Sequence, residues 1–224
     1  MSGPPGPAVS TGGLEAPAGL AEVQGAWRRQ GRSLDGGPMD EVSDVVWLQA
    51  GRHFCDLRAA LPGHGSAHPL DLPQAFSGTV EVGAGDIAFS HDIDSVRRDP
   101  SHPDQSTVHR AGEVLMERGP GFEERWVLAS LPGDAATVAE LWPPDDPAAG
   151  SPLARVVRVG DLALAVWGGR SPGGARYSSR SAWEAEAPGG GDAALRLDAA
   201  VHALVHGDVL PDGWTRRPAA EVRP

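Results

Sequence analysis

Residues 45–58 read VVWLQAGRHFCDLR, and this stretch decides the fold. It is typical of a β-hairpin with strands at 42–49 and 52–58 and a turn at Ala50-Gly51. Side chains of a strand alternate between its two faces, so one face of the first strand carries Val45, Trp47 and Gln49. The other face carries Val46 and Leu48. Both faces are bulky, which predicts a central strand covered on both sides.

The returning strand places Phe54, Asp56 and Arg58 on one face and His53, Cys55 and Leu57 on the other. Inside a barrel, the Asp56 and Arg58 charges would satisfy each other and line a pocket. On the outside they would form an exposed ion pair worth ~0–1 kcal/mol. The sequence leaves both interpretations open.

The rest of the chain repeats short alternating segments between glycine-rich turns, with almost no helical periodicity. We therefore predict an all-β fold, an antiparallel barrel of meander topology with few or no helices. Closure of a barrel also removes exposed sheet edges. Further strands are expected at 25–34, 75–82, 87–94, 107–118 with a turn at 111–112, 122–128, 137–142, 153–159, 162–167 and 181–186.

Three regions are expected along the chain. Residues 1–24 are rich in Pro, Gly and Ala and predict a disordered tail, with a short helical turn at 20–24 leading into the domain. Residues 25–215 form the barrel domain, with two sub-barrels split near 131–152 as an alternative. Residues 216–224 are expected to be a loose tail.

Composition restricts the function classes. A formal net charge of -11 argues against nucleic acid and against an anionic membrane as partners. The sequence has no signal-peptide pattern and no apolar run long enough to span a membrane, so we expect a cytoplasmic protein. The single cysteine, Cys55, excludes a disulfide within the chain and is expected to be a buried, inert thiol.

The seven tryptophans are the best indication of a ligand. Those that point inward could line an apolar pocket for a hydrophobic small molecule. They could equally fill the core of a barrel that has only four phenylalanines and one tyrosine. The ligand-binding candidates are Trp27, Trp47, Gln49, Phe54 and Trp126.

Charged residues within apolar strands need partners. A buried ion-pair network across the barrel floor is one interpretation; general acid and base groups of a cofactor-free cyclase or isomerase are the other. For the enzyme, the catalytic candidates are Asp56, Arg58 and Glu124. The whole charged set comprises Arg28, Asp56, Arg58, Glu117, Glu124 and Arg125.

A metal or cofactor is not expected. His91, Asp92 and Asp94 are suitable metal ligands, but strict alternation points His91 away from both aspartates. Haem bound through one of the eight histidines is a weaker alternative. No phosphate-binding loop, dinucleotide fingerprint or nucleophile elbow occurs in a usable context.

Several short motifs resemble an uncharacterised bacterial family of lipocalin-like β-barrels, and the middle of the chain is similar to a fungal family built of two such barrels. The resemblance covers about residues 25–170 and implies a calycin-type barrel with a small cavity, but no settled activity. The motifs are Gly25-x-Trp27-Arg28-Arg29, Val46-Trp47-Leu48-Gln49, Asp56-x-Arg58, Phe76-Ser77-Gly78-Thr79, Asp92-Ile93-Asp94, Glu117-Arg118-Gly119, Glu124-Arg125-Trp126 and Val159-Gly160-Asp161.

Three functions remain open from the sequence. The first is a binding barrel that holds an apolar or aromatic small molecule in a tryptophan-lined cavity. The second is the cyclase or isomerase, in which a carboxylate and an arginine converge in the cavity. The third is a filled barrel that acts as a scaffold or interaction protein. Whether Trp47 and Phe54 point into or out of the barrel helps to distinguish these three functions.

Overall fold

A computed structural model shows the fold and describes residues 18–60, 74–94, 103–130, 136–142, 152–160, 162–167, 175–179, 182–185 and 215–218. Every element in these residues is a strand. The predicted all-β class is confirmed.

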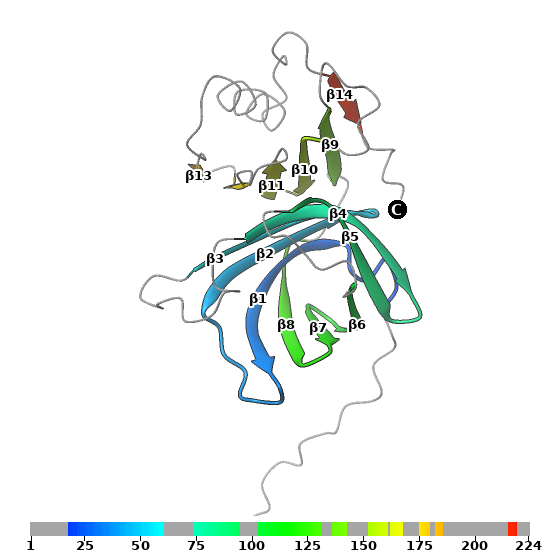
Figure 1. Cartoon of the computed structure of the whole chain (residues 1–224), viewed down its shortest axis with the longest axis vertical. Helices are drawn as coiled ribbons and strands as arrows, with labels where there is room; N and C mark the ends of the chain where they lie inside the picture. The colour runs from blue at the N-terminus through cyan, green and yellow to red at the C-terminus, as the bar shows by residue number, and fades with distance from the viewer. Residues whose placement is uncertain are drawn as a thin grey trace, which may run out of the picture.

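The first eight strands close into one barrel (Figure 1). Each strand pairs antiparallel with the next, and β8 returns to pair with β1. This is the predicted meander. The strands are β1 Gly25–Leu34, β2 Ser43–Ala50, β3 His53–Ala60, β4 Gln74–Gly83, β5 Asp86–Asp94, β6 Asp104–Ala111, β7 Val114–Gly119 and β8 Phe122–Ser130.

The hairpin at 45–58 forms as its sequence predicts. Gly51, in the tight turn, has a φ of 57°, a conformation that glycine adopts without steric cost. Trp47 lies opposite Asp56 across the two strands, and Gln49 lies opposite Phe54. Nearly all of β2 is buried, which confirms that both of its faces are covered.

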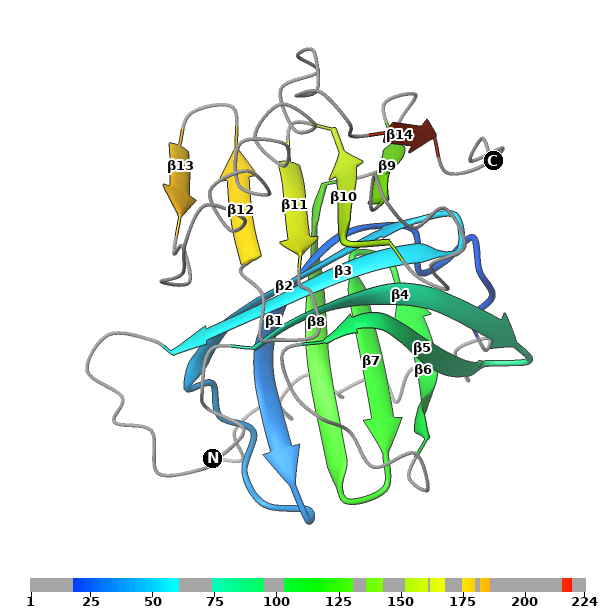
Figure 2. The ribbon, with the colours of Figure 1, turned by 45° about the horizontal axis from the view of Figure 1, so that its top comes forward.

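A second sheet of six strands lies against the outside of the barrel (Figure 2). Its order is β13-β12-β11-β10-β9-β14. The C-terminal strand β14 pairs with β9, so residues 216–218 are not the loose tail that the sequence predicts: the backbone edge of β9 gives them hydrogen-bond partners. The strands are β9 Thr137–Trp142, β10 Ala154–Val159, β11 Leu162–Trp167, β12 Ala175–Ser179, β13 Ala182–Ala185 and β14 Thr215–Pro218.

Two hydrophobic cores follow from the alternation of β2 and β3. Inward side chains such as Trp47 and Phe54 form the core inside the barrel. Outward side chains such as Leu48 and Cys55 form the core beneath the second sheet, against Val157 and others of β10 and β11. Burial raises the pKa of the Cys55 thiol to about 12, as expected for an inert thiol.

A buried charge cluster also joins the second sheet to the barrel. Arg155 of β10 donates to Glu140 of β9 (Nε–Oε1 3.0 Å) and reaches across to Asp92 of β5 (Nη2–Oδ2 2.6 Å). Arg155 is only 2% exposed. The guanidinium therefore links the two layers, and both of its acidic partners depend on it for compensation.

Residues 18–24 close one end of the barrel. The short turn predicted at 20–24 is present at 20–23, and the disorder predicted for 1–24 is wrong over residues 18–24. Val23 is fully buried in the inner core, and its carbonyl accepts a hydrogen bond from Trp27 Nε1 (2.7 Å). Gln24 bonds both the N–H and the carbonyl of Gly51. Only a closed barrel offers these partners, and no local pattern announces them. The remainder of the predicted tail, 1–17, lies outside the described residues.

Candidate functional site

The other end of the barrel, which we term the mouth, lies where β1 ends and β2 begins. The connection 35–42, the flap, folds back over it. Arg32 and Asp40 exchange two backbone hydrogen bonds (2.7 and 3.0 Å), and Ser33 Oγ donates to the carbonyl of Gly37 (2.6 Å). These bonds hold the flap close to the interior side chains of the mouth.

A β-bulge in β1 brings two arginines to the mouth. The register against β8 slips between Arg29 and Gly31, so that Arg29 lies opposite Trp126 and Arg32 opposite Glu124. Strict alternation would send Arg29 and Arg32 to opposite faces. The extra residue in the bulge instead turns both toward the side that Trp126 and Glu124 occupy.

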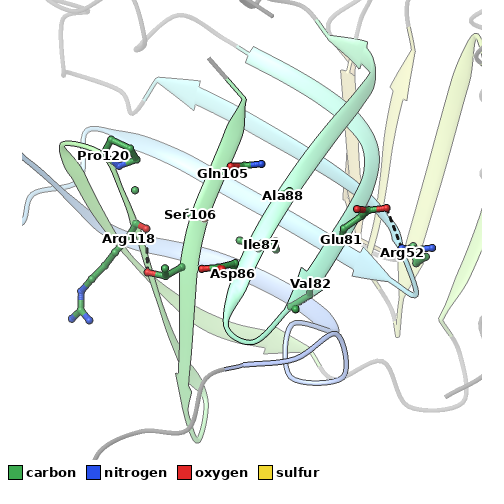
Figure 3. Close-up of a pocket in the computed structure, with 13 residues that line it drawn as sticks. Arg52, Glu81, Val82, Asp86, Ile87, Ala88, Gln105, Ser106, Arg118 and Pro120 are labelled. Carbon is green, nitrogen blue, oxygen red and sulfur yellow. Dashed lines mark hydrogen bonds and ion pairs between the residues drawn. The ribbon is translucent and has the colours of Figure 1, made fainter. Parts of the chain in front are cut away.

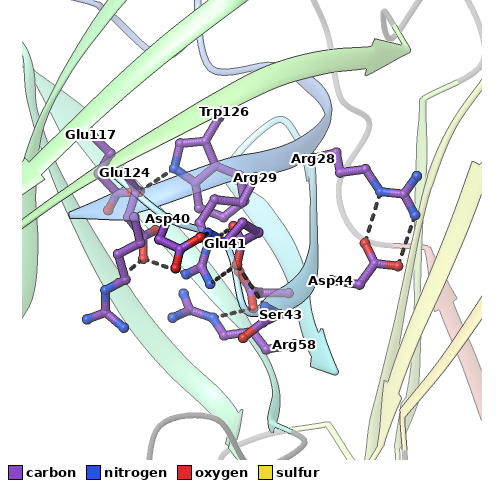
Figure 4. A network of polar contacts seen from close by, with 12 residues as sticks. Arg28, Arg29, Asp40, Glu41, Ser43, Asp44, Arg58, Glu117, Glu124 and Trp126 are labelled. Atoms are coloured by element: carbon purple, nitrogen blue, oxygen red, sulfur yellow. Dashed lines mark hydrogen bonds and ion pairs between the residues drawn. The ribbon is translucent and has the colours of Figure 1, made fainter. Parts of the chain in front are cut away.

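Arg29 is the centre of the mouth's charge network (Figure 4). Its Nε and Nη2 donate to the two oxygens of Glu41 in the flap (2.8 and 3.0 Å), and its Nη1 donates to Glu124 (2.7 Å). Burial alone would lower the pKa of Arg29, but the bonds to Glu41 and the charge of Glu124 raise it. All three guanidinium nitrogens are engaged.

Asp56 and Arg58 also lie inside the barrel, so the exposed interpretation is wrong for Asp56. Arg58 Nε donates to Asp56 Oδ1 (2.9 Å), and the guanidinium lies 5.0 Å from the ring centre of Phe76. Burial raises the pKa of Asp56 despite the arginine. Burial opposes the charge on Arg58, but Asp56 and Glu124 together hold its pKa above the usual value.

Glu117 lies deeper in the barrel, directly opposite Glu124 on the neighbouring strand. Ser106 Oγ donates to its Oε1 (2.8 Å) and Trp126 Nε1 to its Oε2 (3.1 Å). Burial, with repulsion from Glu124, raises the pKa of Glu117 to about 8. Glu117 therefore holds its proton near neutral pH.

Arg32 has the weakest compensation in the network. Its Nε lies 3.4 Å from Glu124 Oε1, which Arg29 already occupies. The Nε atom is buried and lacks a hydrogen-bond partner among the described residues. Burial lowers the pKa of Arg32, and repulsion from Arg29 and Arg58 lowers it further.

A pocket of about 330 Å³ lies between the flap and these arginines. Leu34 is the most exposed large apolar side chain among the described residues, at 45%, and stands in the pocket wall. The pocket therefore combines an apolar wall with a cationic one. Its lining is Arg29, Arg32, Leu34, Gly37, Pro38, Asp40, Glu41, Val42, Ser43 and Arg58.

Two other hollows are more open. One of about 780 Å³ runs over β4 to β7, with the Arg52–Glu81 ion pair at its edge (Figure 3). Another, of about 560 Å³, lies beside the tips of the β1–β2 and β7–β8 connections and includes Met39. Neither brings buried charged groups together as the mouth pocket does.

The predicted ligand-binding residues all point into the barrel and are almost fully buried. The Trp47 ring centre lies 6.4 Å from that of Trp27 and 5.6 Å from that of Trp126. Phe54 packs in the same core, and Gln49 accepts a hydrogen bond from Trp47 Nε1 (3.1 Å) near the closed end. The rings pack on one another, and no tryptophan lines any of the three pockets above. Their role in ligand binding stays a prediction.

Four of the six charged residues predicted to form a network do so. Asp56, Arg58, Glu117 and Glu124 come together inside the barrel. Arg28 and Arg125 do not, because each faces outward; Arg28 pairs with Asp44 on the surface (Figure 4).

The sequence prediction omitted Arg29, Arg32 and Glu41 from the mouth. Arg29 lies two residues after Trp27 in β1 and therefore on the same face, and that signal could have placed it inside the barrel. Arg32 depends on the bulge, and Glu41 depends on the flap. Neither has a comparable local signal.

His91 and Asp94 also differ from the prediction. The register of β4 and β5 slips between Ser77 and Gly78, which makes Asp92 an extra residue. Asp92 therefore faces Arg155, whereas Asp94 returns to the side of His91 and lies 3.1 Å from its Nδ1. Within the described part of the chain, no group of three or more potential metal ligands is found.

Comparison with solved structures bears on the fold. An uncharacterised protein from Saccharomyces cerevisiae is 15% identical, with a TM-score of 0.50 over 71% of this chain and 83% of its own. A lipocalin-like protein from Bacteroides uniformis is 15% identical, with a TM-score of 0.37 over 48% of this chain and 98% of its own. An uncharacterised protein from Bacteroides eggerthii is 11% identical, with a TM-score of 0.35 over 47% and 98%.

The barrel is a closed antiparallel meander of eight strands, which is the architecture that the motif resemblance implied. The resemblance drawn from the sequence motifs is thus confirmed at the level of fold, and the barrel encloses a buried aromatic cluster. No family model matches the chain, and no curated protein does. Among the described residues there is no helix long and apolar enough to cross a membrane.

Proposed function

We propose that this lipocalin-like barrel is a binding protein for a small organic molecule, and that the ligand occupies the mouth pocket. The observation that carries the proposal is the pocket itself. It has an apolar wall on the flap side and a wall of buried and half-buried arginines on the barrel. Its volume of about 330 Å³ lies within the range usual for small-molecule sites.

The aromatic core supports this location of the ligand. A ligand among the tryptophans would have to separate rings that are already in contact, at the cost of packing energy. A ligand in the mouth would instead rest above this core, beneath the flap that backbone and side-chain bonds hold against the mouth. The tryptophans then serve as a rigid floor. This places the ligand elsewhere than in the tryptophan-lined cavity expected from the sequence.

The test uses native mass spectrometry of the full chain purified from its own host. Val42→Trp fills the pocket from the flap, whereas Met39→Trp adds the same side chain to the flap outside this pocket. We expect a small molecule on the wild type and on Met39→Trp but not on Val42→Trp. Retention by Val42→Trp, or a wild type that stays bare after incubation with host extract, would refute the proposal.

A cofactor-free cyclase or isomerase is a second candidate, favoured by one observation. Glu117 is a buried acid whose pKa of about 8 keeps it protonated at neutral pH, as a general acid requires. Asp56, Arg58 and Glu124 lie in the same network. This candidate ranks second because Glu117 is absent from the pocket lining. Host extract incubated with wild type but not with Glu117→Gln should then accumulate a product isomeric with a consumed metabolite.

A further inference from the structure

The two walls of the mouth pocket indicate the chemical class of the ligand, provided that the proposed function holds. The first clue is the difference among the three arginines that line it. Arg29 is saturated, because Glu41 and Glu124 accept from all three of its guanidinium nitrogens. It can therefore offer little to a ligand.

Arg58 has unused hydrogen-bond donors. Its Nε is engaged by Asp56, but Nη1 and Nη2 have no hydrogen-bond partner among the described residues. About a quarter of its side chain, 23%, is exposed, and it stands in the pocket lining. The terminal edge of the guanidinium is thus accessible from the pocket.

Arg32 is the arginine that lacks a carboxylate of its own. Glu41 and Glu124 bond Arg29, and Asp56 bonds Arg58, which leaves Arg32 only the 3.4 Å contact with Glu124. Its Nε is a buried donor without an acceptor. The side chain is 21% exposed and stands in the pocket lining, so a ligand acceptor can reach the guanidinium and compensate its charge.

The charges around the pocket also restrict the ligand. Arg32 lies close enough to Arg29 and Arg58 for their charges to lower its pKa, so an anion between the guanidiniums would relieve repulsion. Glu41 and Glu124 lie in the same network and disfavour a doubly charged group such as a phosphate monoester. A single negative charge on a planar group is the best match, because a carboxylate accepts two parallel bonds from a guanidinium.

The opposite wall requires an apolar body. Leu34, Pro38 and Val42 line the flap side, and Leu34 is exposed to solvent when the pocket is empty. We therefore propose that the mouth pocket binds a monocarboxylic acid with an apolar body, its carboxylate on Arg32 and Arg58 and its body against the flap.

The test compares three probes with the same eight-carbon chain: octanoate, octan-1-ol and octylammonium. Titration calorimetry at pH 7 and low salt measures each against the full chain. We expect octanoate to bind at least tenfold more tightly than octan-1-ol, because a charge-assisted bond is lost with the alcohol. Octylammonium should be weaker than both.

The variants separate this site from a general charge effect. Arg32→Gln should weaken octanoate about tenfold or more and leave octan-1-ol unchanged. Arg28→Gln removes the same charge from the same strand outside the barrel, and should change octanoate less than about twofold. The double variant Asp56→Asn with Arg58→Met removes both charges together, which avoids a lone buried carboxylate, and should also lose the preference for octanoate.

The outcomes distinguish the two proposals. If octanoate and octan-1-ol bind equally and Val42→Trp blocks both, the carboxylate site is refuted and the pocket stands. If Arg32→Gln binds octanoate as well as the wild type does, the carboxylate site is likewise refuted. If no probe shows saturable binding that Val42→Trp blocks, the proposed binding function itself fails.

Discussion

Glu117 should make the stability of this protein fall as the pH rises toward 8. Its ordinary pKa is 4.5, and in the folded barrel it is raised to about 8, by burial first and then by Glu124. Between these two pH values the folded state holds a proton that the unfolded state has released. The contribution of Glu117 to stability is therefore greatest below about pH 4.5 and is lost as the pH rises through about 8.

The size of the effect follows from proton linkage. A difference of one bound proton changes the free energy of unfolding by about 3 kcal/mol between about pH 5 and about pH 7. Glu117→Gln keeps the size of the side chain but cannot lose a proton. Its amide can accept from Trp126 Nε1 and donate to Ser106 Oγ, so both neighbours keep a partner.

Urea denaturation, followed by tryptophan fluorescence at unit steps from pH 5 to pH 8, measures the slope. We expect the free energy of unfolding of the wild type to fall more steeply with pH than that of Glu117→Gln, and the variant to be the more stable protein at pH 8. Glu81 is an exposed glutamate on β4, so Glu81→Gln should show the same pH dependence of the free energy of unfolding as the wild type. Parallel curves for wild type and Glu117→Gln would show that Glu117 is ionised in the barrel and refute the reasoning.

Three further results are expected. Arg155→Met should destabilise the protein by about 3–5 kcal/mol in urea denaturation, because it removes the arginine that compensates the buried Glu140 and the partly exposed Asp92; a change under about 1 kcal/mol would contradict this. Cys55, with its buried thiol, should react with a disulfide reagent only as fast as the chain unfolds, and immediate reaction in buffer would disprove its burial. Gly78→Ala should prevent folding or lower the melting temperature sharply, since a Cβ there would clash with the Ser90 carbonyl oxygen; an unchanged melting temperature would contradict the close approach.

Much of the barrel could be predicted because its signals are local. The alternation of apolar side chains in the hairpin at 45–58 reports both the strands and their faces, and the turn at Gly51 follows from the sequence itself. That Phe54, Asp56 and Arg58 share one face follows from the same alternation. What alternation cannot report is which of the two faces is the interior.

The closed end and the second sheet illustrate what local signals miss. Val23 looks like part of a tail, and it is buried only because the completed barrel offers it an apolar end. Residues 216–218 look loose, and they are ordered into a strand only because the edge of β9 lies nearby. In both cases the partner is remote in sequence, so composition suggests disorder where packing supplies structure.

The sequence by itself determined the strands of the barrel, their turns and the all-β class, since these depend on side chains a few residues apart. Only the tertiary structure decided the candidate site and the surroundings of His91, since bulges in β1 and β5 reverse the alternation of their side chains. One turns Arg32 inward beside Arg29, and the other returns Asp94 to the side of His91. A single extra residue in a strand changes the face of every residue that follows it, and its position is set by the pairing of strands far apart in the chain.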